Sequence, residues 1–262
     1  MKIKMYQIDA FTDRVFGGNP AAVCPLSNWI DDELMQNIAM ENNLAETAFF
    51  VKNGDVYEIR WFTPTVEVDL CGHATLASAF VLFNYLEHHH DEIVFHSHRS
   101  GELLISRKEG LITLNFPTDT LTEVIITDPL VHGFPIKPIK AFKGKTHYLF
   151  IYRDEHEVLS LSPVFQEIVK LDCRGIIVTA RGSESDFVSR FFAPQIGVNE
   201  DPVTGSAHTS LIPYWSKELK RNALTAIQLS SRRGHLQCKY LSERVEISGY
   251  AKAYLQGEIV IE

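Results

Sequence analysis

The sequence predicts two α+β domains, each a mixed β-sheet around a central helix, that arose by internal duplication. The segment RWFTP at 60–64 recurs as RFFAP at 190–194, an offset of about 130 residues. Three further pairs of segments share an offset of about 133 residues, close to half of the chain: 72–74 with 205–207, 101–103 with 234–236, and 112–114 with 245–247. Four matches in the same order at nearly one offset indicate a duplicated module.

The second observation is that each half carries the same order of predicted elements. Residues 56–62 alternate in polarity, which indicates a strand, and the mostly apolar residues 73–86 predict a buried helix. Residues 102–106 and 111–116 flank a four-residue turn, as in a β-hairpin. The second half repeats this order with a strand into Pro194, a loop to Gly205, a helix from Ser206 and a hairpin of 236–241 and 244–248.

The remaining elements complete the predicted domains. Residues 31–42 form an amphipathic helix, with Ser27 or Asn28 as its N-cap and acidic residues in its first turn. In the second-half helix, Pro213 is expected to cap, kink or shorten the first turns. Four prolines within 117–138 place the domain boundary there. We therefore expect domains at 1–118 and 128–262, related by pseudo-twofold symmetry.

Composition restricts the class of protein. The chain has 262 residues, 25 Lys and Arg against 33 Asp and Glu, a net charge of −8 and 45% hydrophobic residues, which is typical of soluble globular proteins. The absence of a basic region disfavours nucleic-acid binding. The longest nearly apolar run, 74–86, is shorter than the roughly 20 residues of a membrane span, and the N-terminus resembles no signal peptide. A small-molecule enzyme or a protein-binding module remains.

The four cysteines are widely spaced and form no CxxC pair. They predict neither a disulfide framework nor a zinc ribbon, and they favour a reducing, cytoplasmic location. His88, His89, His90, His96 and His98 suggest a metal site, but no HExxH motif or carboxylate set accompanies them, and a polar loop explains them. Residues 17–19 lack the GK[ST] ending of a phosphate-binding loop. We therefore expect no metal and no cofactor.

The two glycines that precede the predicted central helices are candidates for ligand binding. Gly72 and Gly205 occupy matching places, and the first backbone N–H groups of a helix lack partners within the helix. Duplicated domains often place a site at their interface. Two helix N-termini facing one cleft would form a carboxylate or oxyanion site. The alternative is that each glycine only makes a tight turn.

Three ionisable residues lie near these turns. Glu46 stands at the entrance of an apolar strand, where it loses part of its hydration, as suits a proton shuttle; the alternative is a solvated charge at a strand end. Asp201 is held extended by Pro202 and either points into the cleft or forms an Asx turn. His73 begins a helix, whose dipole favours the neutral imidazole.

Cys71 and Thr204 occupy matching places immediately before the two glycines. Two cysteines there would indicate a two-base racemase, with one thiol on each face of the substrate carbon. Thr204 breaks this pattern, because a threonine hydroxyl is too weak an acid to alternate as acid and base.

Five segments together resemble the PhzF-like family, named for an isomerase of phenazine biosynthesis: 16–23, 43–47, 60–64, 69–75 and 199–208. The resemblance implies the diaminopimelate epimerase fold with a cofactor-free site in the interdomain cleft. It also implies that Glu46 is the acid/base residue, with His73, Asp201 and Ser206 as partners and Asn19 nearby. In the related epimerases the two catalytic cysteines fall at the positions of Cys71 and Thr204.

The expected function follows from the residues and the resemblance together. We expect a cofactor-independent isomerase that shifts a proton on a small carboxylated, unsaturated or cyclic metabolite. Glu46, His73 and Asp201 would be catalytic, and the substrate would be bound by Asn19, Cys71, Gly72, Thr204, Gly205 and Ser206. The alternatives are an amino-acid racemase or epimerase using Cys71, or a non-catalytic ligand- or protein-binding protein on the same fold. The resemblance further implies a homodimer and a last strand, 257–262, that returns to the first domain.

Overall fold

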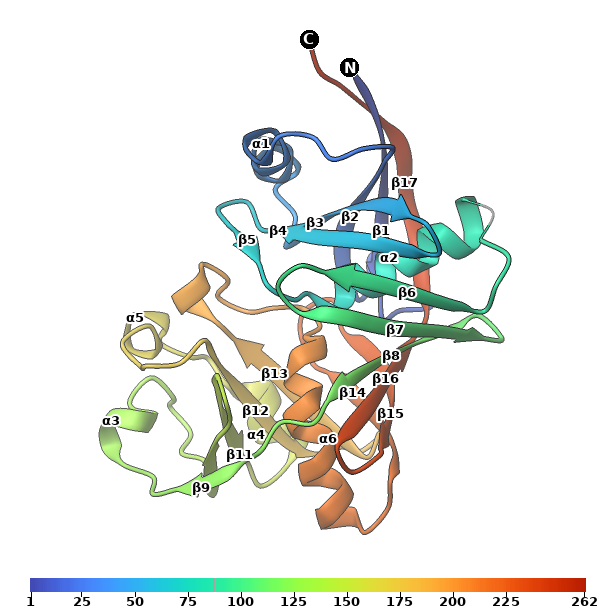
Figure 1. Cartoon of the computed structure of the whole chain (residues 1–262). Helices are drawn as coiled ribbons and strands as arrows, with labels where there is room; N and C mark the ends of the chain where they lie inside the picture. The colour runs from blue at the N-terminus through green and yellow to red at the C-terminus, as the bar shows by residue number, and fades with distance from the viewer. Residues whose placement is uncertain (87) are drawn as a thin grey trace. The chain divides into compact units, whose positions relative to one another are not determined.

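The chain forms two compact units in the computed structural model, which describes residues 1–86 and 88–262. The first unit comprises Met1–Phe116 together with Ile247–Glu262, and the second comprises Pro117–Glu246 (Figure 1). Sequence reasoning placed the halves at 1–118 and 128–262 and returned only residues 257–262 to the first domain. The chain instead re-enters the first unit at Ile247, and β16 (Arg244–Gly249) contains that point.

The first unit is a mixed sheet with two helices. Its elements are β1 (Lys2–Ala10), β2 (Asn19–Leu26), α1 (Asp32–Asn42), β3 (Glu46–Asn53), β4 (Val56–Phe62), β5 (Glu67–Val68), α2 (Gly72–Tyr85), β6 (Glu92–Ser97), β7 (Gly101–Lys108), β8 (Leu111–Pro117) and β17 (Ala251–Val260). The strand order β2, β3, β4, β6 is joined by parallel, antiparallel and parallel pairing in turn.

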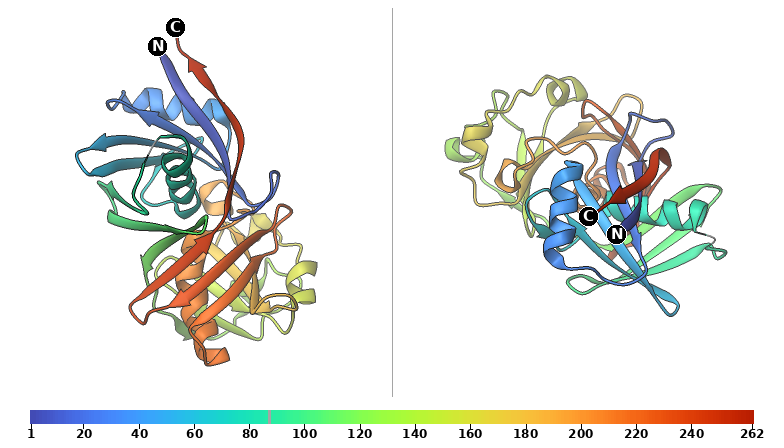
Figure 2. Two further views of the ribbon diagram at one scale, coloured as in Figure 1. Left: turned by 90° about the vertical axis from the view of Figure 1, so that its right-hand side faces the viewer. Right: turned by 90° about the horizontal axis from the view of Figure 1, so that it is seen from above.

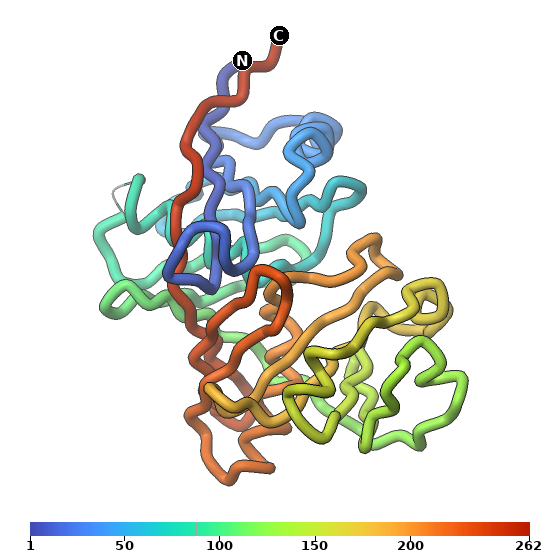
Figure 3. Tube along the Cα trace, turned by 180° about the vertical axis from the view of Figure 1, so that it is seen from behind, coloured from blue at the N-terminus to red at the C-terminus, as the bar shows by residue number. Residues whose placement is uncertain are grey.

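The two termini of the chain pair along one edge of this unit. β17 runs antiparallel to β1 from Ala251 opposite Ala10 to Val260 opposite Lys2, and Figure 3 shows the two ends of the chain side by side. The ladder explains the early return of the chain, because β1 offers a partner along its full length. The returning strand is therefore longer than the predicted 257–262.

Helix α2 is the centre of the first unit. It is apolar around nearly its whole circumference, and it packs against β1, β2 and β3 (Figure 2). Such an all-round apolar helix is stable only when it is buried. The burial fixes the start of the helix, where the candidate site residues lie.

Helix α1 begins later than sequence reasoning expected. Its N-cap is Asp31, whose side chain makes no capping hydrogen bond, so neither Ser27 nor Asn28 caps it. Asp32 and Glu33 occupy the first turn, where their charges complement the helix dipole. The start of α1 is thus stabilised by these two charges and not by a side-chain cap.

The second unit repeats the arrangement of the first. Its elements are β9 (Thr122–Val124), α3 (Asp128–Val131), β10 (Lys140–Lys143), β11 (His147–Ile151), α4 (Glu155–Ser160), α5 (Phe165–Ile168), β12 (Gly175–Arg181), β13 (Phe187–Phe192), the 3₁₀ helix η1 (Pro194–Ile196), α6 (Gly205–Leu219), β14 (Ala223–Gln228) and β15 (Gly234–Tyr240). The order β11, β12, β13, β14 again has parallel, antiparallel and parallel pairing. Both units therefore have the α+β architecture that the repeats predicted.

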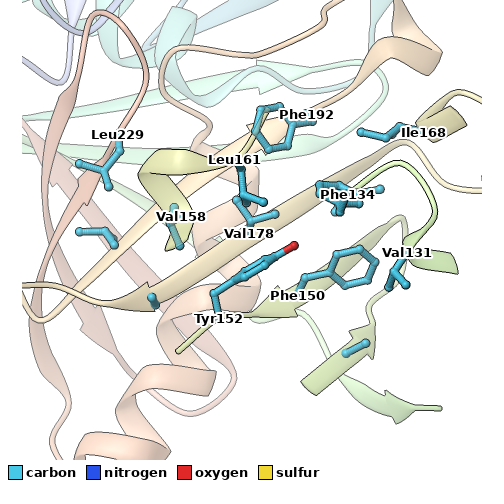
Figure 4. Packing of buried hydrophobic residues seen from close by; sticks show 14 of the residues in the cluster. Val131, Phe134, Phe150, Tyr152, Val158, Leu161, Ile168, Val178, Phe192 and Leu229 are labelled. Atoms are coloured by element: carbon cyan, nitrogen blue, oxygen red, sulfur yellow. The ribbon is translucent and has the colours of Figure 1, made fainter. Parts of the chain in front are cut away.

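The core of the second unit is formed by aromatic and aliphatic side chains from its strands and short helices. Figure 4 shows Phe134 beside Phe150, and their rings meet edge to face at 5.3 Å. Tyr152 is buried in the same cluster and donates its hydroxyl to the carbonyl of Ile136 at 3.1 Å. This core holds β11, β12 and β13 in place behind the loop that leads to α6.

Pro213, which was expected to cap, kink or shorten the first turns, lies inside α6 and does not shorten it. A proline lacks the N–H that would bond to the carbonyl four residues earlier, here that of Thr209. The backbone N–H of Asp119 donates to that carbonyl at 3.2 Å, so it is satisfied from outside the helix. The helix consequently continues to Leu219.

Two buried histidines in the second unit predict acid sensitivity of folding. Burial lowers the pKa of His147 and of His208 to about 4. The unfolded chain, with an ordinary histidine pKa of about 6.5, binds more protons between these values, so stability is full above pH 6.5 and falls as the pH drops toward 4. Between pH 7 and pH 5 we expect a loss of about 2 kcal/mol per histidine.

Urea unfolding at pH 7, 6 and 5 measures this loss. His147→Gln should remove about half of the pH dependence, whatever it costs at pH 7. The matched control is His235→Gln, at an exposed position of β15, which should leave the dependence unchanged. An equal dependence in wild type and His147→Gln would contradict the assignment to buried histidine.

The sequence predicted no membrane-spanning helix. Across residues 1–86 and 88–262, no helix combines the length and the apolar character needed to cross a membrane.

Candidate active site

The first group of predicted site residues gathers where three elements of the first unit begin. Asn19 opens β2, Glu46 opens β3 and Gly72 opens α2. β2 and β3 are parallel neighbours, with Ala21 opposite Glu46, so both strands start at the same edge of the sheet. The buried helix α2 brings His73, its second residue, to that edge.

His73 is the centre of this cluster. Its Nδ1 lies 3.1 Å from the Asn19 side-chain amide nitrogen, and its Nε2 lies 3.1 Å from Glu46 Oε2. Cys71 Sγ is 3.4 Å from Nδ1 and 3.9 Å from Nε2. These contacts hold the ring in one orientation between the amide and the carboxylate.

His73 is buried, whereas Glu46 is partly exposed, as proton transfer to a bound ligand requires. The His73 side chain is 4% exposed, whereas that of Glu46 is 18% exposed. Glu46 Oε2 is fully buried and has no hydrogen-bond partner among the described residues, so its 3.1 Å approach to His73 Nε2 is a charge contact, and the exposure belongs to other atoms of the side chain. One side of the glutamate is held by the protein and the other remains accessible.

The ionisation of Cys71 and His73 is set by the same neighbours. Burial, followed by the Glu46 carboxylate, raises the pKa of the Cys71 thiol to about 11. Burial lowers the pKa of His73, but Cys71 and Glu46 favour the imidazolium by more, so the pKa of His73 is above its ordinary value. This differs from the neutral His73 expected from the helix dipole, because the carboxylate lies in direct contact with the ring.

Three of these residues could also hold a metal ion. Glu46, Cys71 and His73 each offer one ligand atom, and the three atoms lie within 4.8 Å of one another. Oxygen, sulfur and nitrogen ligands of this kind suit Zn²⁺. The sequence singled out a different group, which began at His88; the ring nitrogens of His88 lie 3.1 Å from the Tyr57 hydroxyl and 2.9 Å from the Glu92 carbonyl. Those contacts give His88 a packing role.

The second group of predicted residues gathers at the start of α6 in the second unit. The Thr204 hydroxyl donates to Asp201 Oδ2 at 2.6 Å. Gln228, at the end of β14, accepts from the Thr204 backbone N–H at 2.9 Å and donates to the Asp201 carbonyl at 2.7 Å. The segment 201–204 is therefore held at both ends by one buried amide.

The two helix starts are alike in detail. The N-cap residues are Cys71, with φ −136° and ψ 109°, and Thr204, with φ −111° and ψ 99°. Neither helix has a side-chain capping bond at this end, so no cap occupies the first-turn N–H groups after Gly72 and Gly205. Ser206 is the second residue of α6, the place that His73 has in α2.

Sequence reasoning missed Gln228 and two partly buried ion pairs. Gln228 lies 24 residues after Thr204, and no local pattern marks it. The ion pairs join Arg60 to Glu67 and Arg190 to Glu200. A signal for these glutamates existed, because they are separated by the same 133 residues as Gly72 and Gly205.

The fold and the site define a class of protein: two α+β units of the diaminopimelate epimerase type, each with a central helix that begins at candidate site residues. The structure of a predicted epimerase from Pseudomonas aeruginosa has this fold, with a TM-score of 0.78 at 18% identity over 99% of this chain and 100% of that one. The family model for phenazine biosynthesis-like proteins, PhzC-PhzF, matches residues 8–257. The chain belongs to this family.

Closer relatives agree with this assignment. An uncharacterized isomerase of Pseudomonas aeruginosa is 48% identical over 259 residues, which cover 99% of each chain. The crystal structure of a PhzF family protein from Enterococcus faecalis superposes with a TM-score of 0.96 at 46% identity and covers 100% of both chains. The predicted family resemblance and the predicted fold class are both confirmed.

Proposed function

We propose that the protein is an isomerase that moves a proton between two carbons of a small carboxylated, unsaturated or cyclic metabolite, with Glu46 as the acid/base residue and no cofactor. The observation that carries the proposal is the contact of the Glu46 carboxylate with His73 beside a thiol that stays protonated. Relatives that share nearly the whole chain, 48% and 44% identical, bear the name isomerase, which supports the same reaction class.

The proposed reaction uses one base. Glu46 takes a proton from the carbon next to the unsaturated group, and the electron pair moves into the conjugated carboxylate. The uncapped N–H groups at the start of α2 stabilise the negative charge that develops there. Glu46 then returns the proton to a second carbon, and the double bond shifts. His73 keeps the carboxylate oriented and balances its charge.

The second unit is assigned the roles predicted from the sequence. Asp201 exchanges protons with polar substituents of the substrate, and Thr204, Gly205 and Ser206 bind it. The geometry that supports these roles is the hydrogen-bonded set of Asp201, Thr204 and Gln228. Assembly as a homodimer in the cytoplasm is part of the proposal; the four free cysteines suit a reducing compartment.

A racemase that uses Cys71 is the rival reaction. With a pKa of about 11, only on the order of 10⁻⁴ of the Cys71 thiol is ionised at pH 7. The matching position holds Thr204, whose hydroxyl is committed to Asp201. Neither residue suits the two-thiol mechanism.

Solvent deuterium incorporation tests the proposal directly. Purified protein, dialysed against EDTA, is incubated in D₂O with a panel of small unsaturated and cyclic carboxylates, and proton NMR follows the ligand carbons. We expect deuterium at carbons next to the unsaturated group for at least one carboxylate and not for its primary amide. Carboxylates that raise the melting temperature without any exchange would support the binding-protein alternative and overturn the proposal. Exchange that EDTA abolishes would overturn its cofactor-free part.

A further inference from the structure

The arginines of the repeated segment, Arg60 on β4 and Arg190 on β13, each make a two-pronged contact with a glutamate of their own unit, and Arg60 also donates from Nη1 to Asp32 Oδ1 at 2.7 Å. Arg60 Nε and Nη2 donate to the two carboxylate oxygens of Glu67 at 2.8 and 3.0 Å. Arg190 Nε and Nη2 donate to those of Glu200 at 2.7 and 3.0 Å. We name these the first and the second Arg–Glu pair. Two-pronged bonds of this kind fix orientation as well as distance.

Each arginine is also fixed from its other side. The Arg60 guanidinium lies 5.2 Å from the centre of the Phe62 ring, and that of Arg190 lies 4.8 Å from the Phe192 ring. The remaining donor of Arg190 reaches the carbonyls of Val158 and Leu161 at 3.1 and 2.8 Å. Both arginines are largely buried, at 14% and 13% side-chain exposure.

The glutamates stand at a particular point of the chain, four residues before the N-cap of each central helix. In the first unit β5 folds back on β4, with Glu67 opposite Phe62, and four residues later comes Cys71. In the second unit Glu200 is followed directly by Asp201, whose N–H donates to the Phe191 carbonyl at 3.1 Å. Each pair therefore fastens the loop that carries site residues to the strand before it.

We infer that Arg60 and Arg190 are positioning residues for the proposed reaction: through Glu67 and Glu200 they set the places of Cys71 and His73 in one unit and of Asp201 and Thr204 in the other. Asp201 is bonded directly to the fixed Glu200, and Cys71 and Thr204 lie four residues from their glutamates, within at most about 14 Å of extended chain, so each pair limits where these residues can lie. Duplication has kept both pairs although the loops between them differ in length by three residues. The inference rests on the proposed function.

A matched control separates positioning from simple stability. Arg107, on β7, also pairs with a carboxylate and covers an aromatic ring: its Nη2 is 3.1 Å from Asp91 Oδ1, and its guanidinium lies 4.3 Å from the Phe83 ring. Asp91 directly precedes β6, and β6 carries no candidate site residue. Arg107→Lys therefore removes an arginine contact with a carboxylate and a ring, single-pronged and more exposed than the two Arg–Glu pairs, without touching the site loops.

The experiment compares Arg60→Lys, Arg60→Met, Arg190→Lys and Arg107→Lys with wild type. ¹H–¹⁵N NMR of labelled histidine at one fixed pH in EDTA, with the His73 signals assigned by His73→Gln, reads the surroundings of the His73 ring without any substrate. We expect the His73 ring signals to shift in Arg60→Lys, to shift further in Arg60→Met, and to stay in place in Arg107→Lys. His73 signals that stay in place in Arg60→Lys, or move as far in Arg107→Lys, overturn the inference even if no substrate is known.

Kinetics supply the second arm once deuterium exchange is observed. Arg60→Lys and Arg190→Lys should each lower kcat roughly tenfold with KM within about threefold, because a misplaced catalytic group costs turnover more than binding. Arg107→Lys should stay within about twofold of wild type. Equal losses in all three variants would mean that the two pairs act through stability alone. A wild type without exchange would overturn the proposed function, while the NMR arm would still decide the placement of His73.

Discussion

Glu46→Gln is expected to lower the rate of deuterium incorporation by roughly 10² or more while ligand affinity stays within a few fold, the scale of a lost general acid/base. The amide keeps the size and the polar contacts of the carboxylate, but it cannot take up a proton. The contact of His73 with the Asn19 side chain remains, so the orientation of the ring should survive. Rates from proton NMR in D₂O and affinities from thermal shift give the two quantities separately.

Two companion variants make this result specific. Cys71→Ala should cost much less than Glu46→Gln, because the thiol is buried and protonated at neutral pH. Glu92→Gln is the matched control, since Glu92 also opens a strand of the same unit, but its side chain is exposed. Should Cys71→Ala abolish exchange while Glu46→Gln preserves it, the thiol carries the chemistry and the assignment is wrong.

The duplication was readable from the sequence because it lies in linear patterns. The alternation of 56–62 and the apolar run after Gly72 recur at fixed offsets, and the common order of elements in the two halves follows from them. The places of Glu46 at the start of β3 and of His73 at the start of α2 were also predictable from the sequence. Their direct contact at 3.1 Å was not, because it depends on the parallel pairing of β2 with β3 and on the burial of α2.

Other features depend on partners that are distant in sequence. The early return of the chain at Ile247 reflects the open edge of β1, some 250 residues away. The persistence of α6 through Pro213 reflects one N–H of Asp119. Gln228 joins the site through its amide alone. In each case the partner is distant in sequence, and no local sequence pattern around the stabilised residue predicts it.

Two effects on the pKa of His73 oppose each other: the helix dipole, which favours the neutral ring, and the Glu46 carboxylate, which favours the imidazolium. A dipole acts as about half of a charge at the helix end and is worth about 0.3–1 kcal/mol in most settings. A carboxylate in contact with the ring carries a full charge within a buried site, where Coulomb interactions are less screened than in water. The contact therefore determines the direction of the shift.

Gly18→Ala is expected to destabilise the protein by about 3 kcal/mol or more and to disturb the site as well. Gly18 has φ +59°, and a Cβ there would overlap the backbone carbonyl oxygen of Ala10, which cannot swing aside as a flexible side chain could. The next residue is Asn19, whose amide orients His73. Relief of the overlap would shift the start of β2 and, with it, that amide. Urea unfolding measures the loss of stability, and the NMR signals of the His73 ring report the displacement of the Asn19 amide.

Gly54→Ala separates the two costs that Gly18→Ala combines. Gly54 has nearly the same backbone conformation, φ +62°, but a Cβ there would meet no atom within 4 Å. Gly54→Ala should therefore lower the free energy of unfolding only by the cost of the positive φ, about 1 kcal/mol, and leave the NMR signals of the His73 ring unchanged. The difference between the variants measures the overlap with Ala10. Equal losses in the two variants would show that β1 and β2 give way at little cost, and that Gly18 is needed only for its backbone conformation.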